Sequence, residues 1–167
     1  MRTTRPNKQE YYLDIARAVA QRSTCLRAIA GSVIVGNDSA ISLAYNGSPR
    51  NWSNCLDTQI CKRGNECKPG EGIEKCVAVH SEVNAVINAQ RNGAIPLIGS
   101  KMYLYFKRFD EYLAPYDKPC DNCIKIITQA GIVEVISHIE DKERIKITVS
   151  EYKNNIWKTE IINVMKK

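Results

Sequence analysis

Two short motifs that lie far apart along the chain place the strongest limit on its fold. The first is HSE at residues 80–82 and the second is PCDNC at residues 119–123, and each begins a segment with helical periodicity. His80, Cys120 and Cys123 are ligand types that zinc prefers, and three such ligands leave the fourth tetrahedral position open. Neither motif supplies all three ligands, so the two helix starts must meet in space if they hold one ion.

Glu82 follows His80 by two positions, so on a helix its side chain points to a different side from the imidazole. We therefore expect Glu82 to shuttle protons beside the metal rather than to bind it. The order H-x-E followed by P-C-x-x-C is typical of zinc enzymes that replace the exocyclic amine of a nucleobase. A lone histidine or a lone C-x-x-C pair is more often structural, but the two motifs together indicate a catalytic zinc.

The other cysteines form a second group around a long segment, residues 46–75, that has little periodicity. The chain has seven cysteines, an odd number that cannot pair completely within one chain, and residues 1–10 do not resemble a secretion signal. We therefore expect a cytoplasmic protein with reduced thiols. Four of the remaining five could close a structural zinc site, or all five could be plain thiols. Spacing alone does not select four from this set: Cys25, Cys55, Cys61, Cys67 and Cys76.

The hydrophobic pattern predicts an α/β fold in which residues 1–167 form one domain, with a core at about 9–137 and a C-terminal extension at 138–167 whose pattern is weaker. The expected helices are 8–21, capped by Asn7, then 80–91, and 119–131 with Pro119 in its first turn. The expected strands are 29–35, 40–45, 101–106 and 132–137. An irregular insert occupies 107–118, and the chain closes with a hairpin around Asn154 and Asn155, or alternatively with a helix.

The formal net charge of +6 has two interpretations. It keeps the protein soluble, or it attracts an anionic ligand by long-range electrostatic steering. No run of lysine and arginine is dense enough for a polynucleotide-binding arm, so we expect a small-molecule nucleotide rather than a nucleic acid as the partner. No apolar run approaches the length of about 20 residues that spans a bilayer, so no membrane association is expected.

From about residue 9 to residue 136 the chain resembles the deoxycytidylate (dCMP) deaminases of the cytidine deaminase superfamily, including viral and bacterial members. The resemblance rests on eight short elements: RSTC at 22–25, GSVIV at 31–35, YNGSP at 45–49, GEG at 70–72, KC at 75–76, HSEVNA at 80–85, PCDNC at 119–123 and QAGI at 129–132.

This resemblance implies a three-layer α/β/α sandwich around a mixed sheet. It also implies hydrolysis of dCMP to dUMP and ammonia, a reaction that supplies dTMP synthesis. Members are cytoplasmic (in the host cytoplasm, if viral), many assemble as homohexamers, and many respond to dCTP as activator and dTTP as inhibitor.

The resemblance also assigns roles to single residues. Asn46 matches an asparagine that contacts the sugar, and Arg27 lies near the place of a phosphate-binding arginine. Besides the catalytic zinc, several members carry a structural zinc, whose ligands here would be Cys25, Cys55, Cys61 and Cys76, with Cys67 as the spare.

Three departures from the family pattern leave other functions open. Ser81 replaces the usual alanine and can cap its helix, and Asn88 stands where some members have an apolar residue. The insert 107–118 carries Phe109, Tyr112 and Tyr116, which would cover the pocket or lie on a subunit interface. The alternatives are a deaminase for dCTP, for free cytidine, or for tRNA or single-stranded DNA, and a zinc-stabilised binding module without catalysis.

Overall fold

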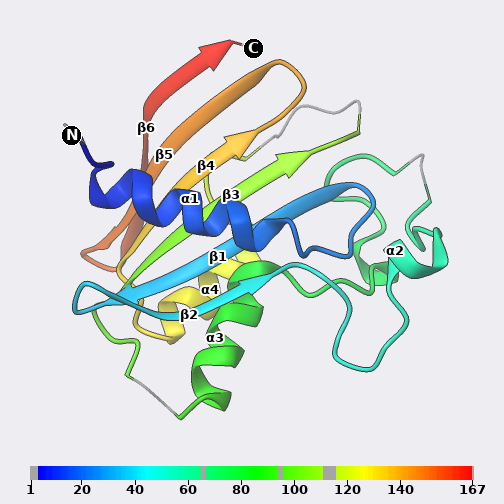
Figure 1. Ribbon diagram of the computed structural model, residues 1–167, viewed down its shortest axis with the longest axis horizontal. Coiled ribbons are helices and arrows are strands. Elements are labelled where there is room, and N and C mark those ends of the chain that lie inside the picture. Colours follow the sequence, from blue (N-terminus) through cyan, green and yellow to red (C-terminus); the bar gives the residue numbers. More distant parts are fainter. Residues whose placement is uncertain (1–3, 65–66, 94–95, 111–115, 167) are drawn as a thin grey trace.

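The computed structural model describes residues 4–64, 67–93, 96–110 and 116–166, and it has the expected three layers (Figure 1). The elements in chain order are α1 (Lys8–Ala20), β1 (Ala28–Gly36), β2 (Ser39–Tyr45), α2 (Cys55–Thr58), the 3-10 helix η1 (Ile73–Lys75), α3 (Ser81–Arg91), β3 (Lys101–Arg108), α4 (Asp121–Gln129), β4 (Glu134–Glu140), β5 (Arg144–Lys153) and β6 (Ile156–Lys166).

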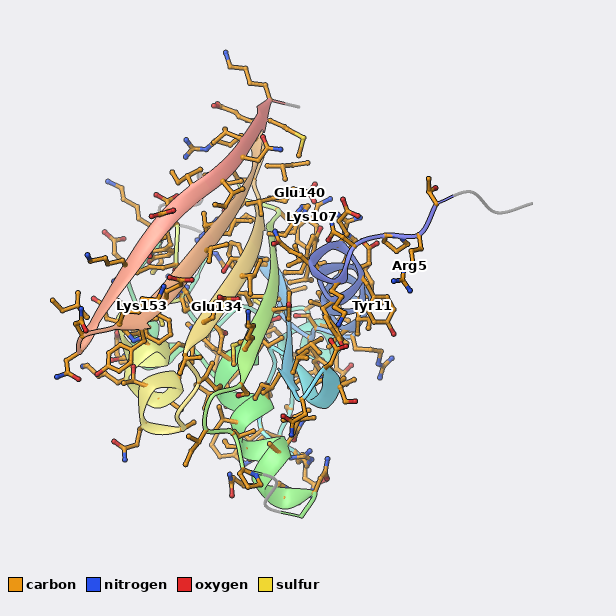
Figure 2. All side chains as sticks on the ribbon, turned by 90° about the vertical axis from the view of Figure 1, so that its left-hand side faces the viewer. Arg5, Tyr11, Lys107, Glu134, Glu140 and Lys153 are labelled. Atoms are coloured by element: carbon orange, nitrogen blue, oxygen red, sulfur yellow. The ribbon has the colours of Figure 1, made fainter. Side chains whose placement is uncertain are left out.

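One six-stranded sheet runs through the middle of the molecule in the order β2-β1-β3-β4-β5-β6. β3 and β4 are parallel and the other neighbouring pairs are antiparallel, so the sheet is mixed as expected. An ion pair lies at each end of the parallel pairing between β3 and β4 (Figure 2). Lys101 pairs with Glu134 at 3.0 Å and Lys107 pairs with Glu140 at 2.9 Å, and in each case the two residues are directly opposite each other on the two strands.

Helix α1 covers one face of the sheet. The expected Asn7 cap is present as a capping box with Glu10, and the buried side chains of α1 pack on β1 and β3. Gly31 permits the close approach, because a Cβ there would lie 2.1 Å from the carbonyl oxygen of Ala16. A side chain at this position would force helix and sheet apart.

Helices α3 and α4 lie on the opposite face (Figures 1 and 2). Ala85 and Ala89 of α3 and Ile127 of α4 are at most 1% exposed and pack with Ile34 and Met102 of the sheet. The small alanine side chains let α3 lie close to the strands. This core fixes the N-terminal ends of α3 and α4, the two helix starts that carry the motifs.

Several sequence-based boundaries were wrong, and the strand expected at 132–137 lies at Glu134–Glu140. Pro119 is not in the first turn of its helix, because Cys120 has extended backbone angles (φ −62°, ψ 159°) and is itself the N-cap of α4. β3 continues beyond Phe106 to Arg108, because its pairing with β1 extends to Ala28 opposite Arg108. The irregular part of the insert therefore begins only at Phe109.

The C-terminal hairpin is confirmed and the alternative C-terminal helix is wrong. Asn154 and Asn155 have φ values of 52° and 62°, the left-handed conformation that a two-residue hairpin turn requires and that asparagine tolerates. Strands β5 and β6 extend the sheet on which the motif-bearing helices α3 and α4 pack. None of the helices among the described residues is long and apolar enough to cross a bilayer.

Candidate metal centre and active site

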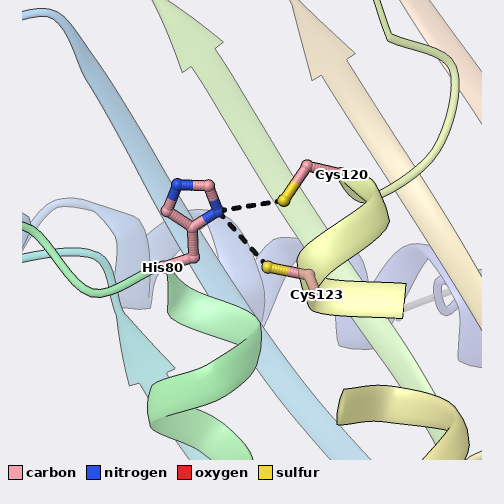
Figure 3. Close-up of side chains that lie close together, drawn as sticks. All are labelled: His80, Cys120 and Cys123. Atoms are coloured by element: carbon pink, nitrogen blue, oxygen red, sulfur yellow. Dashed lines mark hydrogen bonds between the residues drawn. The ribbon is translucent and has the colours of Figure 1, made fainter. Parts of the chain in front are cut away.

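The three predicted ligands come together at the ends of α3 and α4 (Figure 3). His80 is the N-cap of α3, Cys120 is the N-cap of α4, and Cys123 lies in the first turn of α4. Nδ1 of His80 is 3.5 Å from Sγ of Cys120 and 3.3 Å from Sγ of Cys123. All three donor atoms lie within 4.8 Å of one another, a spacing that one metal ion can bridge.

Electrostatics at this cluster show that it suits a cation. A hydrogen bond from the Cys123 thiol lowers the pKa of Cys120 to about 4, and the same bond, together with burial, raises the pKa of Cys123. The Cys120 sulfur in turn raises the pKa of His80 through its hydrogen bond to the ring. Two adjacent thiols therefore compete to ionise, and a divalent ion between them would stabilise both thiolates at once. The donor set of one imidazole and two sulfurs fits zinc.

Glu82 lies beside the cluster without belonging to it. The side chain is 6% exposed, and its carboxylate lies close enough to the Cys123 thiol to raise the pKa of that thiol. Ser81 donates a hydrogen bond to Oε2 of Glu82 at 3.0 Å, and Ser32 of β1 donates to Ser81 at 2.8 Å. Ser81 therefore does not cap the helix, although its position allowed this, and instead links the carboxylate to strand β1.

Asn46 is buried directly after β2. Its Oδ1 accepts from the backbone N–H of Ala30 at 2.8 Å, and its Nδ2 donates to the carbonyl of Ala28 at 3.0 Å. The next residue, Gly47, forms a two-way backbone bridge with Val79, which directly precedes His80. These bonds hold Asn46 near the metal cluster, and the sugar contact expected of it stays a prediction.

Arg27 has partners that argue against its expected role. Nε and Nη2 bind Asp110 at 3.2 Å and 3.1 Å, and the guanidinium also donates to the carbonyls of Gly64 and Cys67. Burial alone would raise the pKa of Asp110, but the hydrogen bonds from Arg108 and Arg27 outweigh it and lower that pKa. With its side chain 10% exposed, Arg27 joins the insert to the long loop, and a phosphate would have to displace these partners; the phosphate contact expected of Arg27 stays a prediction.

Arg63 is a residue that the motifs did not indicate. Its charge is close enough to lower the pKa of His80, against the larger upward shift from Cys120. The guanidinium donates to the carbonyls of Lys68 and Glu71 at the exposed surface of the loop. No sequence motif identifies it, because the loop that carries it has no periodicity.

The loop cysteines are close to one another but do not form a tight cluster. Burial raises the pKa of the Cys55 thiol, and Cys25, Cys61 and Cys76 raise it further by their charge. Cys67 instead donates to the carbonyl of Arg63 at 2.8 Å. Among the described residues, only the cluster of His80, Cys120 and Cys123 has three or more ligand atoms within 4.8 Å.

Residues Tyr116 and Asp117, near the end of the insert 107–118, are anchored to the sheet. Lys146 donates to the carbonyl of Tyr116 at 3.2 Å and pairs with Asp117, and Thr148 donates to the carbonyl of Asp117 at 2.6 Å. Phe109 is 56% exposed and Tyr116 is 39% exposed, whereas Tyr112 lies outside the described residues.

The polar residue at position 88 has a structural explanation. Asn88 of α3 donates to the carbonyl of Leu43 at 3.1 Å and accepts from Arg50 at 2.8 Å. It therefore ties the exposed side of α3 to the edge strand β2, which an apolar side chain cannot do.

Comparison with known proteins agrees with this geometry. Residues 6–139 match the family described as the cytidine and deoxycytidylate deaminase zinc-binding region. The deoxycytidylate deaminase of Mycobacterium phage D29 is 33% identical over 138 residues, which is 80% of this chain and 95% of that protein. The enzyme of Schizosaccharomyces pombe is 32% identical over 136 residues, but the chain spans only 38% of its length.

A solved structure with the same fold is the dCMP deaminase of the cyanophage S-TIM5 in complex with dCMP and dUMP. It is 25% identical to this chain, with a TM-score of 0.58, and the match covers 83% of this chain and 85% of that one. A profile match over most of the chain, on a fold that brings a histidine and two cysteines together, shows that the chain belongs to the cytidine and deoxycytidylate deaminase family.

Proposed function

We propose that this chain hydrolyses dCMP to dUMP and ammonia at the cluster of His80, Cys120 and Cys123, which would hold one zinc ion. The observation that carries the proposal is the meeting of these three donor atoms within 4.8 Å, beside the buried carboxylate of Glu82. Several relatives are named deoxycytidylate deaminases, and one solved relative holds dCMP and dUMP.

Zinc, when bound, supplies a Lewis acid that lowers the pKa of a water molecule to about 7 and so provides a nucleophile at neutral pH. Glu82 takes one proton from that water and delivers it to N3 of the cytosine ring, while the water oxygen bonds to C4 of the ring. Glu82 then carries the remaining hydroxyl proton to the exocyclic amine, so that the C4–N bond breaks, ammonia leaves and a C4 carbonyl remains. Burial suits this role, because water that would compete for the proton is kept away from the carboxylate.

Ser81 and Ser32 hold the carboxylate in place for these transfers. The hydroxyl of Ser81 donates to Oε2 of Glu82 and so fixes the orientation of the carboxylate. Ser32 and Ser81 are both 0% exposed, which keeps the chain of hydrogen bonds in one arrangement.

Binding of the nucleotide is proposed to involve Asn46 and Arg63. The bridge between Gly47 and Val79 holds Asn46 next to the segment that carries His80, and this position supports the proposed contact with the sugar. Arg63 is proposed for the phosphate because it lies at the exposed surface of the loop and its charge acts on His80. Its guanidinium donates to the carbonyls of Lys68 and Glu71, whereas that of Arg27 is paired with the carboxylate of Asp110.

A second, structural zinc bound by Cys25, Cys55, Cys61 and Cys76 is also proposed. The support is electrostatic: beyond the effect of burial, the charges of the other three sulfurs raise the pKa of Cys55. Cys67, the spare in this assignment, instead donates a hydrogen bond to the carbonyl of Arg63. An ion there would draw the four sulfurs together and tie the long loop to the end of α1 and to the residues before His80.

The resemblance supports four further proposals about the protein in the cell. These are a single domain over residues 1–167, assembly as a homohexamer, regulation by dCTP and dTTP, and a place in the supply of dTMP. A cytoplasmic location, in the host if the protein is viral, is supported by its seven free cysteines.

An assay of ammonia release from dCMP, dCTP, cytidine, single-stranded DNA and RNA tests the proposal. We expect dCMP to be the preferred substrate of the zinc-loaded protein. Glu82→Gln should lower kcat by a factor of about 10² to 10⁴ while zinc content and thermal stability are kept. A fully active Glu82→Gln variant would contradict the role of Glu82, and zinc-loaded protein that releases no ammonia from dCMP would contradict the proposed function. Zinc-loaded protein that releases no ammonia from any of these substrates would favour a non-catalytic binding module.

A further inference from the structure

Strand β6 is the outermost strand of the sheet, and its edge is exposed and apolar (Figures 1 and 2). Five apolar side chains along it are between 42% and 58% exposed: Ile156, Ile161, Ile162, Val164 and Met165. A long exposed strand edge with apolar side chains is a template for pairing with another strand. The family match ends at residue 139, before β5 and β6, so the active site does not account for this edge.

The hairpin turn determines which backbone groups of β6 face outward. Lys153 and Ile156 lie opposite each other across Asn154 and Asn155, whose positive φ values are those of a type I′ turn. Such a turn closes on a hydrogen-bonded pair, and in an antiparallel ladder hydrogen-bonded and non-hydrogen-bonded pairs then alternate.

Alternation from that closing pair gives the orientation of the next residues. Trp157, Thr159 and Ile161 belong to the non-hydrogen-bonded pairs with β5, and the register is regular over this stretch. Their N–H and C=O groups therefore point away from β5, toward the open edge. An incoming strand would find its hydrogen-bonding partners at these three residues.

We propose that β6 pairs antiparallel with β6 of a second copy of the chain, centred on Thr159, so that two sheets become one. In this register Thr159 lies opposite the partner's Thr159, and Trp157 lies opposite the partner's Ile161. Lys158 lies opposite the partner's Glu160, and the two-fold axis repeats this pair. Aromatic–aliphatic and opposite-charge pairs of this kind stabilise antiparallel strands.

Other centres of the same pairing fit less well. A centre at Lys158 or Glu160 sets like charges against each other. A centre at Trp157 or Ile161 leaves both charges opposite uncharged residues. The match of opposite charges in the register centred at Thr159 favours a second copy as the occupant, since a self-complementary strand needs no other partner. This pairing does not depend on the proposed reaction.

Sedimentation velocity of the full chain over a range of concentrations tests the pairing. Thr159→Pro removes a backbone N–H that points toward the open edge, a position where an edge strand tolerates proline. Because the partner strand loses this hydrogen bond, the variant should form an assembly of half the mass. Thr159→Ala is the matched control: it loses the same hydrogen bond to Ser150 but keeps the N–H, and should assemble like the parent protein. An assembly whose mass is unchanged by the proline would overturn the pairing, as would a parent protein that stays monomeric.

A charge swap tests the register without relying on proline. Lys158→Glu or Glu160→Lys alone places like charges opposite each other twice and should weaken association about tenfold, and the double swap should restore it. Exchange of the Thr159 amide proton, followed by NMR, should slow as protein concentration rises. Single and double variants that associate equally, or exchange that does not depend on concentration, would contradict this register.

Discussion

Replacing Asp110 by asparagine is expected to destabilise the protein by about 2–4 kcal/mol, because two buried guanidinium groups depend on its charge. Asp110 accepts from Nε of Arg108 at 2.7 Å and from Nε and Nη2 of Arg27 at 3.2 Å and 3.1 Å. The arginine side chains are 8% and 10% exposed, and that of Asp110 is 19% exposed. Removing one partner of a buried ion pair lowers the free energy of unfolding by about 3–5 kcal/mol. The side-chain carbonyl of asparagine still accepts a hydrogen bond, so part of this stability is kept.

The matched control is Asp121→Asn, which removes an ion pair of similar chemistry at the surface. Asp121 meets Lys118 at 3.2 Å with its side chain 84% exposed, so its loss should cost less than about 0.5 kcal/mol. Urea unfolding of both variants measures the difference. If Asp110→Asn is as stable as the control, the guanidinium of Arg27 is not held as described, and its role in phosphate binding would be open again.

The same contact predicts how stability depends on pH. The folded-state pKa of Asp110 is lowered, so its contribution is fully present above the ordinary aspartate pKa of about 3.9 and is lost as the pH falls through the lower folded-state value. The gap in stability between the parent protein and Asp110→Asn should therefore be constant from neutral pH down to about 4 and shrink below it. A gap that instead widened toward acid pH would contradict this assignment.

Two further predictions concern the active site and the loop. Ser81→Ala removes the hydroxyl that holds Oε2 of Glu82, and kcat should fall about tenfold with KM and zinc content unchanged; an unchanged kcat would mean that other contacts orient the carboxylate. Cys25→Ser should lower the zinc content from two ions to one per chain. It should clearly lower the melting temperature, and its effect on turnover per bound catalytic zinc should be smaller. Two ions retained in Cys25→Ser, or one ion in the parent protein, would count against the second site.

The parts of the fold that follow from the sequence are those encoded by local patterns. The cap at Asn7 and the turn at Asn154 and Asn155 are set by residues next to one another, and both were predicted correctly. The cluster at His80, Cys120 and Cys123 was also predictable, although it joins distant segments, because the chemistry of the three ligands requires them to meet.

The contacts that sequence analysis missed depend on segments without periodicity. Arg27 is held by Asp110 and by carbonyls of the long loop, and no pattern in those segments indicates where their backbone lies. The contact from Ser81 to Glu82 depends on Ser32, which lies on a strand far earlier in the chain and fixes the Ser81 hydroxyl. Such contacts are set by tertiary packing, so they become visible only once the sheet and helices are in place.

Anomalous diffraction at the zinc absorption edge, from crystals of the purified protein, tests the central claim most directly. We expect a peak within bonding distance of Nδ1 of His80 and of Sγ of Cys120 and Cys123, at about 2.0–2.1 Å and 2.3 Å, with Glu82 nearby but not a ligand. Zinc bound only elsewhere in the chain, or at this position through an oxygen of Glu82, would contradict the proposed catalytic site.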